Sequence, residues 1–270
     1  MSIQQIVILL AGVFVLGAVI GSFLNVCIYR IPAGESVVTP RSRCPHCLTT
    51  IRWYHNLPIV SWILLRGRCA YCGAPFSIRY PLVEALTGAL FALFFYRFGV
   101  HQVTLVSWLL AALLVTISFI DLDHQIIPDV ISLPGIPVGF FCSFALPWLS
   151  WQSSLLGILL GGGILLAIAL GYEWLTKQEG MGLGDVKLLA MLGAFLGAPA
   201  ILPIIFLASI MGTAVGVPLM LIKRAGRKLA IPFGPFLAGA ALVYLFFVER
   251  LDPLARWYGQ ALAFWWHSLF

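Results

Sequence analysis

Long apolar runs alternate with short polar connections along most of the chain, and one polar stretch interrupts this pattern near the start. A transmembrane helix needs about 20 consecutive, mostly apolar residues. The apolar runs predict spans over residues 6–29, 82–98, 103–120, 130–149, 153–175, 186–196, 200–222 and 232–248. The run 186–196 reaches membrane length only if its polar neighbours extend it. The polar stretch, residues 30–80, is predicted to form an insert outside the membrane.

Composition supports this division. The chain has 270 residues, of which 61% are hydrophobic and 10% charged, whereas an average soluble domain is about 45–50% apolar and about 25% charged. This excludes an ordinary soluble domain, and the many aromatic residues exclude a disordered chain. We therefore predict an all-α polytopic membrane protein with about eight transmembrane helices and a small cytoplasmic insert.

The distribution of basic residues predicts the orientation. The insert contains only one acid, Glu35, against seven arginines: Arg30, Arg41, Arg43, Arg52, Arg66, Arg68 and Arg79. By the positive-inside rule the insert is cytoplasmic and the N-terminus is outside. The loops at Lys177 and at 223–228 then also fall inside. The outer side holds only Arg97, Arg250 and Arg256. Orientation accounts for the net positive charge, so we expect no nucleic-acid partner.

Four cysteines in the insert form two Cys-x-x-Cys pairs, Cys44 with Cys47 and Cys69 with Cys72. Two such pairs separated by about 20 residues are typical of a tetrahedral zinc site. The reducing cytoplasm disfavours disulfides, and a metal helps a small insert without a large core to fold. Because protein ligands fill all four positions, the predicted site is structural. A redox or unmetallated arrangement is the alternative, and His46 is interpreted as a bystander.

Acidic residues within a membrane protein are functional candidates because their burial is costly. Asp121, Asp123 and Asp129 follow the third run, and Asp185 precedes the sixth. The predicted topology places all four on the cytoplasmic side, where acids from distant segments can meet. Two neighbouring carboxyl groups share one proton, so one can deprotonate water while the other polarises a peptide carbonyl, as in aspartic proteases.

The glycines before Asp185 point to an opening beside this acid. Gly182 and Gly184 permit unusual backbone geometry and leave room for an extended peptide. The alternative is an ordinary loop-to-helix junction in which Asp185 caps the helix. We also expect Asp185 to lie in a hydrated cleft that faces the cytoplasm, because irregular backbone at membrane depth has to line such a cavity.

Other titratable residues have simpler interpretations. Glu84 and Glu173 lie near span ends, where helix capping or a buried ion pair is expected. Lys187 either modulates the ionisation of the acid pair or extends to the membrane interface. Cys27 and Cys142 lie in apolar runs and are expected to be small core residues.

Taken together, these motifs resemble the type IV prepilin peptidase family, intramembrane aspartyl proteases of the Gly-x-Gly-Asp type that also act as N-methyltransferases. The resemblance runs nearly from end to end. It is carried by both cysteine pairs and by segments 21–32, 57–61, 65–67, 77–84, 119–129, 180–189 and 231–236.

The resemblance implies specific roles. Asp121 and Asp185 would be the catalytic pair, with Asp123, Asp129, Gly182 and Gly184 supporting them; residue chemistry alone does not separate Asp121 from Asp123. Such an enzyme cuts the short basic leader of prepilins or pseudopilins after a glycine, at the cytoplasmic face of the bacterial inner membrane. It also methylates the new N-terminus with S-adenosylmethionine, for which no residues are assigned here.

These interpretations divide the chain into a first transmembrane helix (1–29), a cytoplasmic insert with a four-cysteine zinc site (30–80), a seven-helix peptidase domain (81–250) and an amphiphilic tail (251–270). The resemblance associates the insert with the methylation activity. Two competing functions are a proton-coupled transporter and a catalytically inactive pilus or secretion assembly factor. The first predicts acids near the bilayer midplane and repeated halves. The second predicts loss of the motif aspartates.

Overall fold

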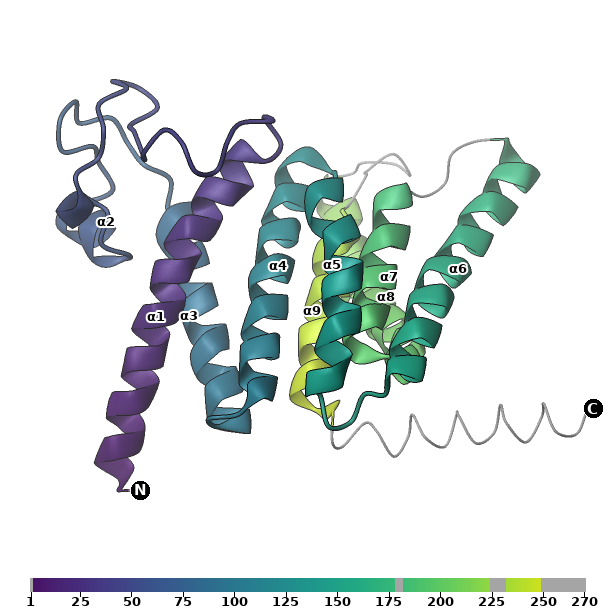
Figure 1. Cartoon of the computed structure of the whole chain (residues 1–270). Coiled ribbons are helices and arrows are strands. Elements are labelled where there is room, and N and C mark those ends of the chain that lie inside the picture. Colours follow the sequence, from purple (N-terminus) through teal and green to yellow (C-terminus); the bar gives the residue numbers. More distant parts are fainter. Residues whose placement is uncertain (1, 178–181, 224–231, 249–270) are drawn as a thin grey trace, which may run out of the picture. The chain divides into compact units, whose positions relative to one another are not determined.

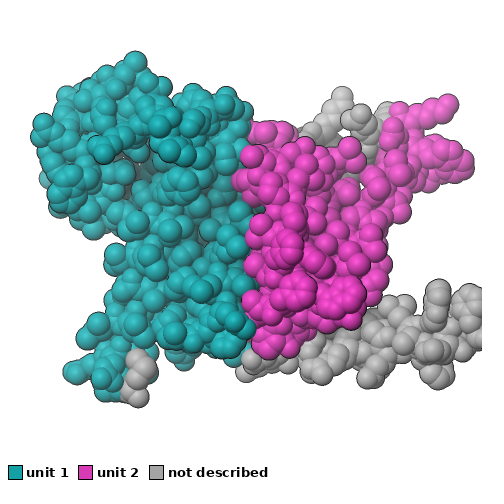
Figure 2. All heavy atoms as spheres, in the orientation of Figure 1, with its two compact units in different colours: residues 1–120 teal, residues 121–270 magenta. Residues whose placement is uncertain are grey.

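Most of the described chain outside the insert is helical (Figure 1). The computed structural model describes residues 2–177, 182–223 and 232–248. The predicted tail and the basic positions Arg224, Arg227, Lys228, Arg250 and Arg256 lie outside these ranges. The chain forms two compact units, residues 1–120 and 121–270 (Figure 2). We describe each unit by itself.

Each predicted apolar run corresponds to a helix. Five helices are long and apolar enough to cross a membrane: α1 (Ile3–Arg30), α3 (Arg79–Phe98), α4 (Gln102–His124), α6 (Trp151–Thr176) and α8 (Ala198–Lys223). The shorter helices are α2 (Val60–Leu64), α5 (Asp129–Cys142), α7 (Leu183–Leu196) and α9 (Gly234–Phe246), with 3₁₀ turns at Trp53–His55 and Ser143–Ala145. The all-α membrane fold is confirmed, while the count of eight spans stays a prediction.

The unit boundary falls inside α4 and differs from the segments predicted from the sequence. Residues 1–120 group α3 and most of α4 with the insert, whereas residues 121–270 hold α5 to α9. The division into functional segments at residues 29, 80 and 250 stays a prediction, because compactness does not assign function.

In the first unit, α1 and α3 pack closely through small residues. A Cβ atom at Gly17 would lie 2.8 Å from the Gly88 Cα atom, and one at Gly21 would lie 2.8 Å from the Glu84 Cα atom. Small residues allow such an approach between membrane helices. At the end next to the insert, the Asn25 side chain donates a hydrogen bond of 3.1 Å to the carbonyl of Tyr80. This bond ties the end of α1 to the beginning of α3.

In the second unit, α7 occupies the centre. It packs against α5, α6, α8 and α9, and its residues from Leu188 to Leu196 are all buried. A helix that is apolar on every side is buried on every side. Neighbouring helices rather than lipid therefore surround most of α7, which accounts for its short, uniformly apolar sequence.

The contact between α6 and α7 depends on glycines. A Cβ atom at Gly157 would overlap the backbone oxygen of Gly193, and a Cβ atom at Gly193 would overlap the backbone of Gly157. Next to them, the Ser154 hydroxyl donates a buried hydrogen bond of 2.7 Å to the carbonyl of Ala194. The two backbones thus touch directly, and this contact fixes the position of α7.

We predict that Gly157→Ala destabilises the protein, because its methyl group would force α6 away from α7 at a cost of about 1–3 kcal/mol. The matched control is Gly163→Ala on the same helix, where an added Cβ atom meets nothing within 4 Å. The free energy of unfolding, measured in detergent, should fall for the first variant and change little for the second. Equal stability of the two variants would contradict the close packing.

Candidate functional site

Asp121 is a buried acid near the end of α4. Its residue is 5% exposed, and its Oδ2 atom accepts a hydrogen bond of 2.9 Å from the backbone N–H of Gly234, the first residue of α9. A Cβ atom at residue 234 would lie only 2.6 Å from that oxygen. A glycine is therefore required for α9 to begin against the carboxyl group, and the hydrogen bond fixes the orientation of this group.

Asp185 lies in the first turn of α7 and is half-buried. Like Asp121, it lies near Ile127. Ile127 connects their surroundings, because a Cβ atom at Gly184 would lie 3.0 Å from the Cβ atom of Ile127, and one at Gly234 would lie 3.4 Å from its Cδ1 atom. The two acids to which the resemblance assigns catalysis thus lie on segments that both contact Ile127.

The other two acids that follow the third apolar run, Asp123 and Asp129, have different surroundings from Asp121. Asp123, two residues after the buried Asp121, is exposed. Asp129 begins α5, and both of its carboxyl oxygens bind the Nζ atom of Lys187, at 2.7 and 2.9 Å. The Asp129 and Lys187 side chains are 57% and 32% exposed, so the ion pair contributes little stability. Its main effect is to hold the start of α5 beside the turn that carries Asp185.

Two expectations for the glycine motif are wrong. Gly182 precedes α7 with φ −68° and ψ 137°, a conformation open to any residue, so it does not supply unusual backbone geometry. Asp185 is the third residue of α7 rather than its N-cap, so it does not cap the helix. The expected room is present at Gly182, where an added Cβ atom would meet nothing nearer than 4.0 Å, but not at Gly184, where it would lie 3.0 Å from the Cβ atom of Ile127.

Residue chemistry alone did not find Gly234 or Ile127. Gly234 lies within segment 231–236, which contributed to the resemblance but carries no titratable group. Its role is a backbone N–H, which every residue except proline has, and only the fold shows which carboxyl group that N–H reaches. The sequence feature that could have identified this residue is a glycine next to Pro235 at the start of a predicted helix.

The four cysteines of the insert form one cluster in the first unit. Their sulfur atoms all lie within 4.8 Å of one another, and the Sγ atoms of Cys44 and Cys72 are 3.8 Å apart. Zinc–sulfur bonds of about 2.3 Å in a tetrahedron place sulfurs about 3.8 Å apart. His46 is exposed and outside the cluster. The residues present therefore fit a zinc site with four cysteine ligands.

Two similar turns build this cluster. In the first turn, the N–H of Cys44 donates a hydrogen bond to the carbonyl of Thr49, and the N–H of Leu48 donates one to the carbonyl of Cys44. The second turn has the same two bonds, from Cys69 to Ala74 and from Gly73 to Cys69. The residue after each second cysteine has a positive φ, 57° at Leu48 and 70° at Gly73. Each turn thereby directs two sulfurs to the same side.

The electrostatics of the thiols agree with a cation site. Hydrogen bonds from the side chain and backbone of Thr49 lower the pKa of the Cys47 thiol to about 6. The N–H of Ala74 favours a thiolate at Cys72, yet burial and the three nearby sulfurs raise the pKa of that thiol to about 11. Four sulfurs this close cannot all ionise unless a cation offsets their repulsion.

We predict that Cys44→Ser and Cys72→Ser each reduce zinc affinity about tenfold or more and lower the unfolding temperature, because each removes a thiolate ligand. The matched control is Cys142→Ser, whose half-buried thiol lies in the other unit. Mass spectrometry of bound metal measures the outcome. Full zinc occupancy in both cluster variants would contradict the site.

With this geometry established, the comparisons with known proteins can be interpreted. Residues 15–98 match the family described as Bacterial Peptidase A24 N-terminal domain, and residues 108–217 match the Type IV leader peptidase family. The chain belongs to the type IV leader peptidase family. The first match includes the cysteine cluster, and the second includes Asp121 and Asp185. No solved structure matches the chain.

Several relatives named prepilin leader peptidase/N-methyltransferase are similar over most of the chain. The protein from Aeromonas hydrophila is 37% identical over 91% of this chain and 92% of the relative. The protein from Neisseria gonorrhoeae is 40% identical over 83% of this chain and 85% of the relative. The protein from Myxococcus xanthus is 44% identical, with 80% of this chain aligned to 64% of that longer relative.

Proposed function

We propose that this protein is a prepilin leader peptidase and N-methyltransferase whose peptidase site is the pair Asp121 and Asp185. The observation that carries the proposal is that both acids lie near Ile127 in the second unit, where the N–H of Gly234 orients the Asp121 carboxyl group. Family membership supports the same reaction class.

In the proposed mechanism the two carboxyl groups share one proton. The ionised member takes a proton from water as the water oxygen attacks the scissile carbonyl carbon, and the protonated member donates to the carbonyl oxygen. When the C–N bond breaks, its electron pair stays on nitrogen, which takes the proton that the first carboxyl group received from water. A hydroxyl group of the intermediate returns its proton to the second carboxyl group as the new carboxyl product forms. One acid ends protonated and the other ionised, so the pair is ready for a further cycle. No covalent enzyme intermediate is needed.

The proposed substrate is a prepilin or pseudopilin anchored in the same membrane. Its leader is cut after a glycine where the substrate helix leaves the lipid on the cytoplasmic side. A substrate confined to the bilayer reaches the acids by lateral diffusion at a fixed depth, which favours a productive orientation. We place the protein in the bacterial inner membrane with the N-terminus outside and the insert inside. The arginine-rich insert supports this orientation.

The second activity proposed is methylation of the newly formed N-terminus. It rests on the names of the relatives, which are N-methyltransferases as well as peptidases. S-adenosylmethionine supplies an electrophilic methyl group when bound. The four-cysteine zinc site would hold the insert in its folded form, because protein ligands occupy every position and leave none for a substrate.

We predict that Asp121→Asn and Asp185→Asn each lower the rate of prepilin cleavage by about 10² to 10⁴, because an amide can neither take nor share the proton. Each variant should be assayed in membranes with a purified prepilin, with gel mobility as the readout. Glu173→Gln is the matched control, an exposed acid at the end of α6, and should cleave like the original chain. Cleavage retained by either aspartate variant contradicts the assignment.

We also predict that Asp185→Cys reacts with a charged, membrane-impermeant thiol reagent added from the cytoplasmic side, because the site has to admit water. Met191→Cys on the same helix is the matched control; Met191 is fully buried and should be protected. Labelling above the background of the native cysteines is measured by mass spectrometry. Complete protection at residue 185 would argue against a hydrated cleft.

A further inference from the structure

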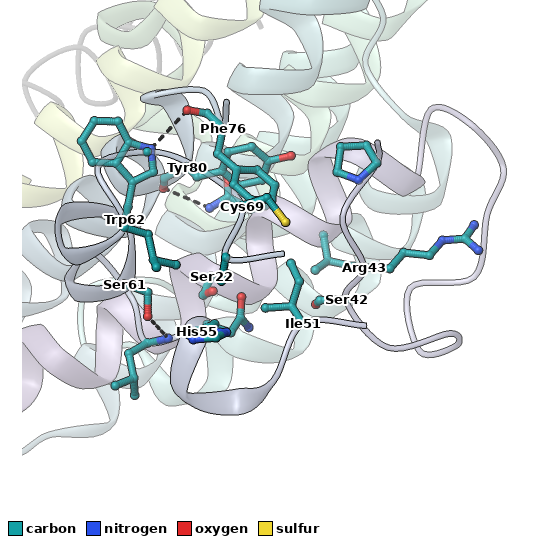
Figure 3. A pocket seen from close by; sticks show the side chains of 18 of the residues that line it. Ser22, Ser42, Arg43, Ile51, His55, Ser61, Trp62, Cys69, Phe76 and Tyr80 are labelled. Atoms are coloured by element: carbon teal, nitrogen blue, oxygen red, sulfur yellow. Dashed lines mark hydrogen bonds between the residues drawn. The ribbon is translucent and has the colours of Figure 1, made fainter. Parts of the chain in front are cut away.

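The first unit contains a cavity that the peptidase mechanism does not use. It has a volume of about 260 Å³ and lies between α1, α3 and the insert (Figure 3). This is close to the lower end of the range for small-molecule pockets, about 300–1,000 Å³. All of its lining residues lie between Ser22 and Glu84, within the first unit. The cavity is therefore a separate candidate site.

Polar side chains from two predicted membrane helices line one side of this cavity. They are Ser22 and Asn25 of α1 and Glu84 of α3, and the last two are only 8% and 7% exposed. Glu84 accepts a hydrogen bond of 2.7 Å from the N–H of Ile59 in the insert and another from the Ser22 side chain. The donors are an amide and a hydroxyl, and Glu84 lies in the second turn of α3. Capping and ion-pair roles are thus both wrong for Glu84.

Burying the Glu84 carboxyl group between membrane helices costs free energy, which indicates that this group has a function. Buried polar groups in membrane helices are expensive and mark binding or transport sites. Glu84 ties α3 to the insert through Ile59, and Asn25 ties α1 to the start of α3 through Tyr80. The polar side of the cavity is consequently held in place by hydrogen bonds before any ligand arrives.

His55 supplies the observation that points directly to a ligand. Its Nδ1 atom is buried and has no hydrogen-bond partner among the described residues, yet His55 lines the cavity (Figure 3). Its ring is held by edge contacts with Tyr54 and Tyr71, with centroids 4.5 and 5.9 Å apart. Leaving such an atom unsatisfied costs about 1–3 kcal/mol. A bound molecule with a hydrogen-bonding group would remove this cost.

Five aromatic side chains also line the cavity. They are Tyr29, Trp62, Tyr71, Phe76 and Tyr80. Trp62 is fixed by a hydrogen bond of 3.3 Å from its Nε1 atom to the Phe76 carbonyl. Flat rings can stack on a purine, and their faces attract a cation. Arg43 and Arg68 also line the cavity and can bind a carboxylate.

We propose that this cavity binds S-adenosylmethionine, an inference that rests on the proposed methyltransferase function. The ligand combines the groups that the lining recognises: a purine for the aromatic rings, a sulfonium cation for the carboxyl groups and ring faces, and an amino-acid carboxylate for an arginine. The ribose hydroxyls provide a partner for the Nδ1 atom of His55.

The reaction balances without a further reactant. The lone pair of the unprotonated N-terminal amine forms a bond to the methyl carbon as the carbon–sulfur bond breaks. Sulfur keeps that electron pair and becomes a neutral thioether, and the methylated ammonium loses one proton to water. The cavity residues bind and orient the donor, and the acceptor amine comes from the cleaved substrate.

The first test measures binding by equilibrium dialysis of radiolabelled S-adenosylmethionine with the full-length protein in detergent. His55→Phe preserves a ring between Tyr54 and Tyr71 but removes both ring nitrogens, so the dissociation constant should rise about tenfold. His101→Phe is the matched control, because His101 lies in the turn before α4 and does not line the cavity. It should bind like the original chain. Zinc content and unfolding temperature report whether each variant is folded.

A second measurement uses the unaltered protein, so it does not depend on a variant folding. An 8-azido derivative of S-adenosylmethionine is photo-crosslinked and the labelled peptide is identified by mass spectrometry. Label within residues 22–84, competed by unlabelled donor, supports the proposal. Label confined to residues 121–270, or unchanged affinity in His55→Phe, overturns the cavity assignment while the methyltransferase function stands. Absence of both binding and methylation in a protein that cleaves prepilin overturns the methyltransferase function as well.

Discussion

The Asp121 carboxyl group is the feature around which the second unit is arranged. A carboxyl group that leaves water at the edge of a membrane needs polar partners, and here the backbone N–H of Gly234 provides one. For that N–H to reach it, α9 has to begin against the end of α4, and only a glycine leaves enough space. The position of α9 and the exposure of the acid therefore depend on the same contact.

The placement of Asp185 follows from a second set of close contacts. The backbones of Gly157 and Gly193 touch, which seats α7 among its neighbours. Its first turn then lies over Ile127, and the Asp129–Lys187 pair joins that turn to α5. Glycine contacts along the apolar length of the helix thus control an acid at its polar end. This explains how a site at the membrane edge can be ordered by packing far from it.

The first unit meets a different constraint, since its insert has little apolar core. In place of such a core it has four sulfurs within 4.8 Å of one another, a cluster that could hold a metal ion. Hydrogen bonds from Ile59 to Glu84 and from Asn25 to Tyr80 fasten the insert region to α1 and α3. The cavity is lined by both helices and by the insert, and polar and aromatic side chains from each contribute to it.

The sequence alone determined the helices, the polar insert, the cysteine cluster and the group of candidate acids, because each follows from local patterns: the length of an apolar run, the spacing of cysteines, or an acid at the end of a span. Tertiary structure decided what depends on distances between remote segments. Asp121 is buried and Asp123 is exposed, which distinguishes these two acids. The start of α9 places the N–H of Gly234 against Asp121. The fold of the insert places Glu84 at the wall of a cavity. The structure also shows that Asp185 is the third residue of α7 and does not cap this helix. These results depend on which groups approach one another in space, and the type of a residue does not by itself specify its neighbours in the fold.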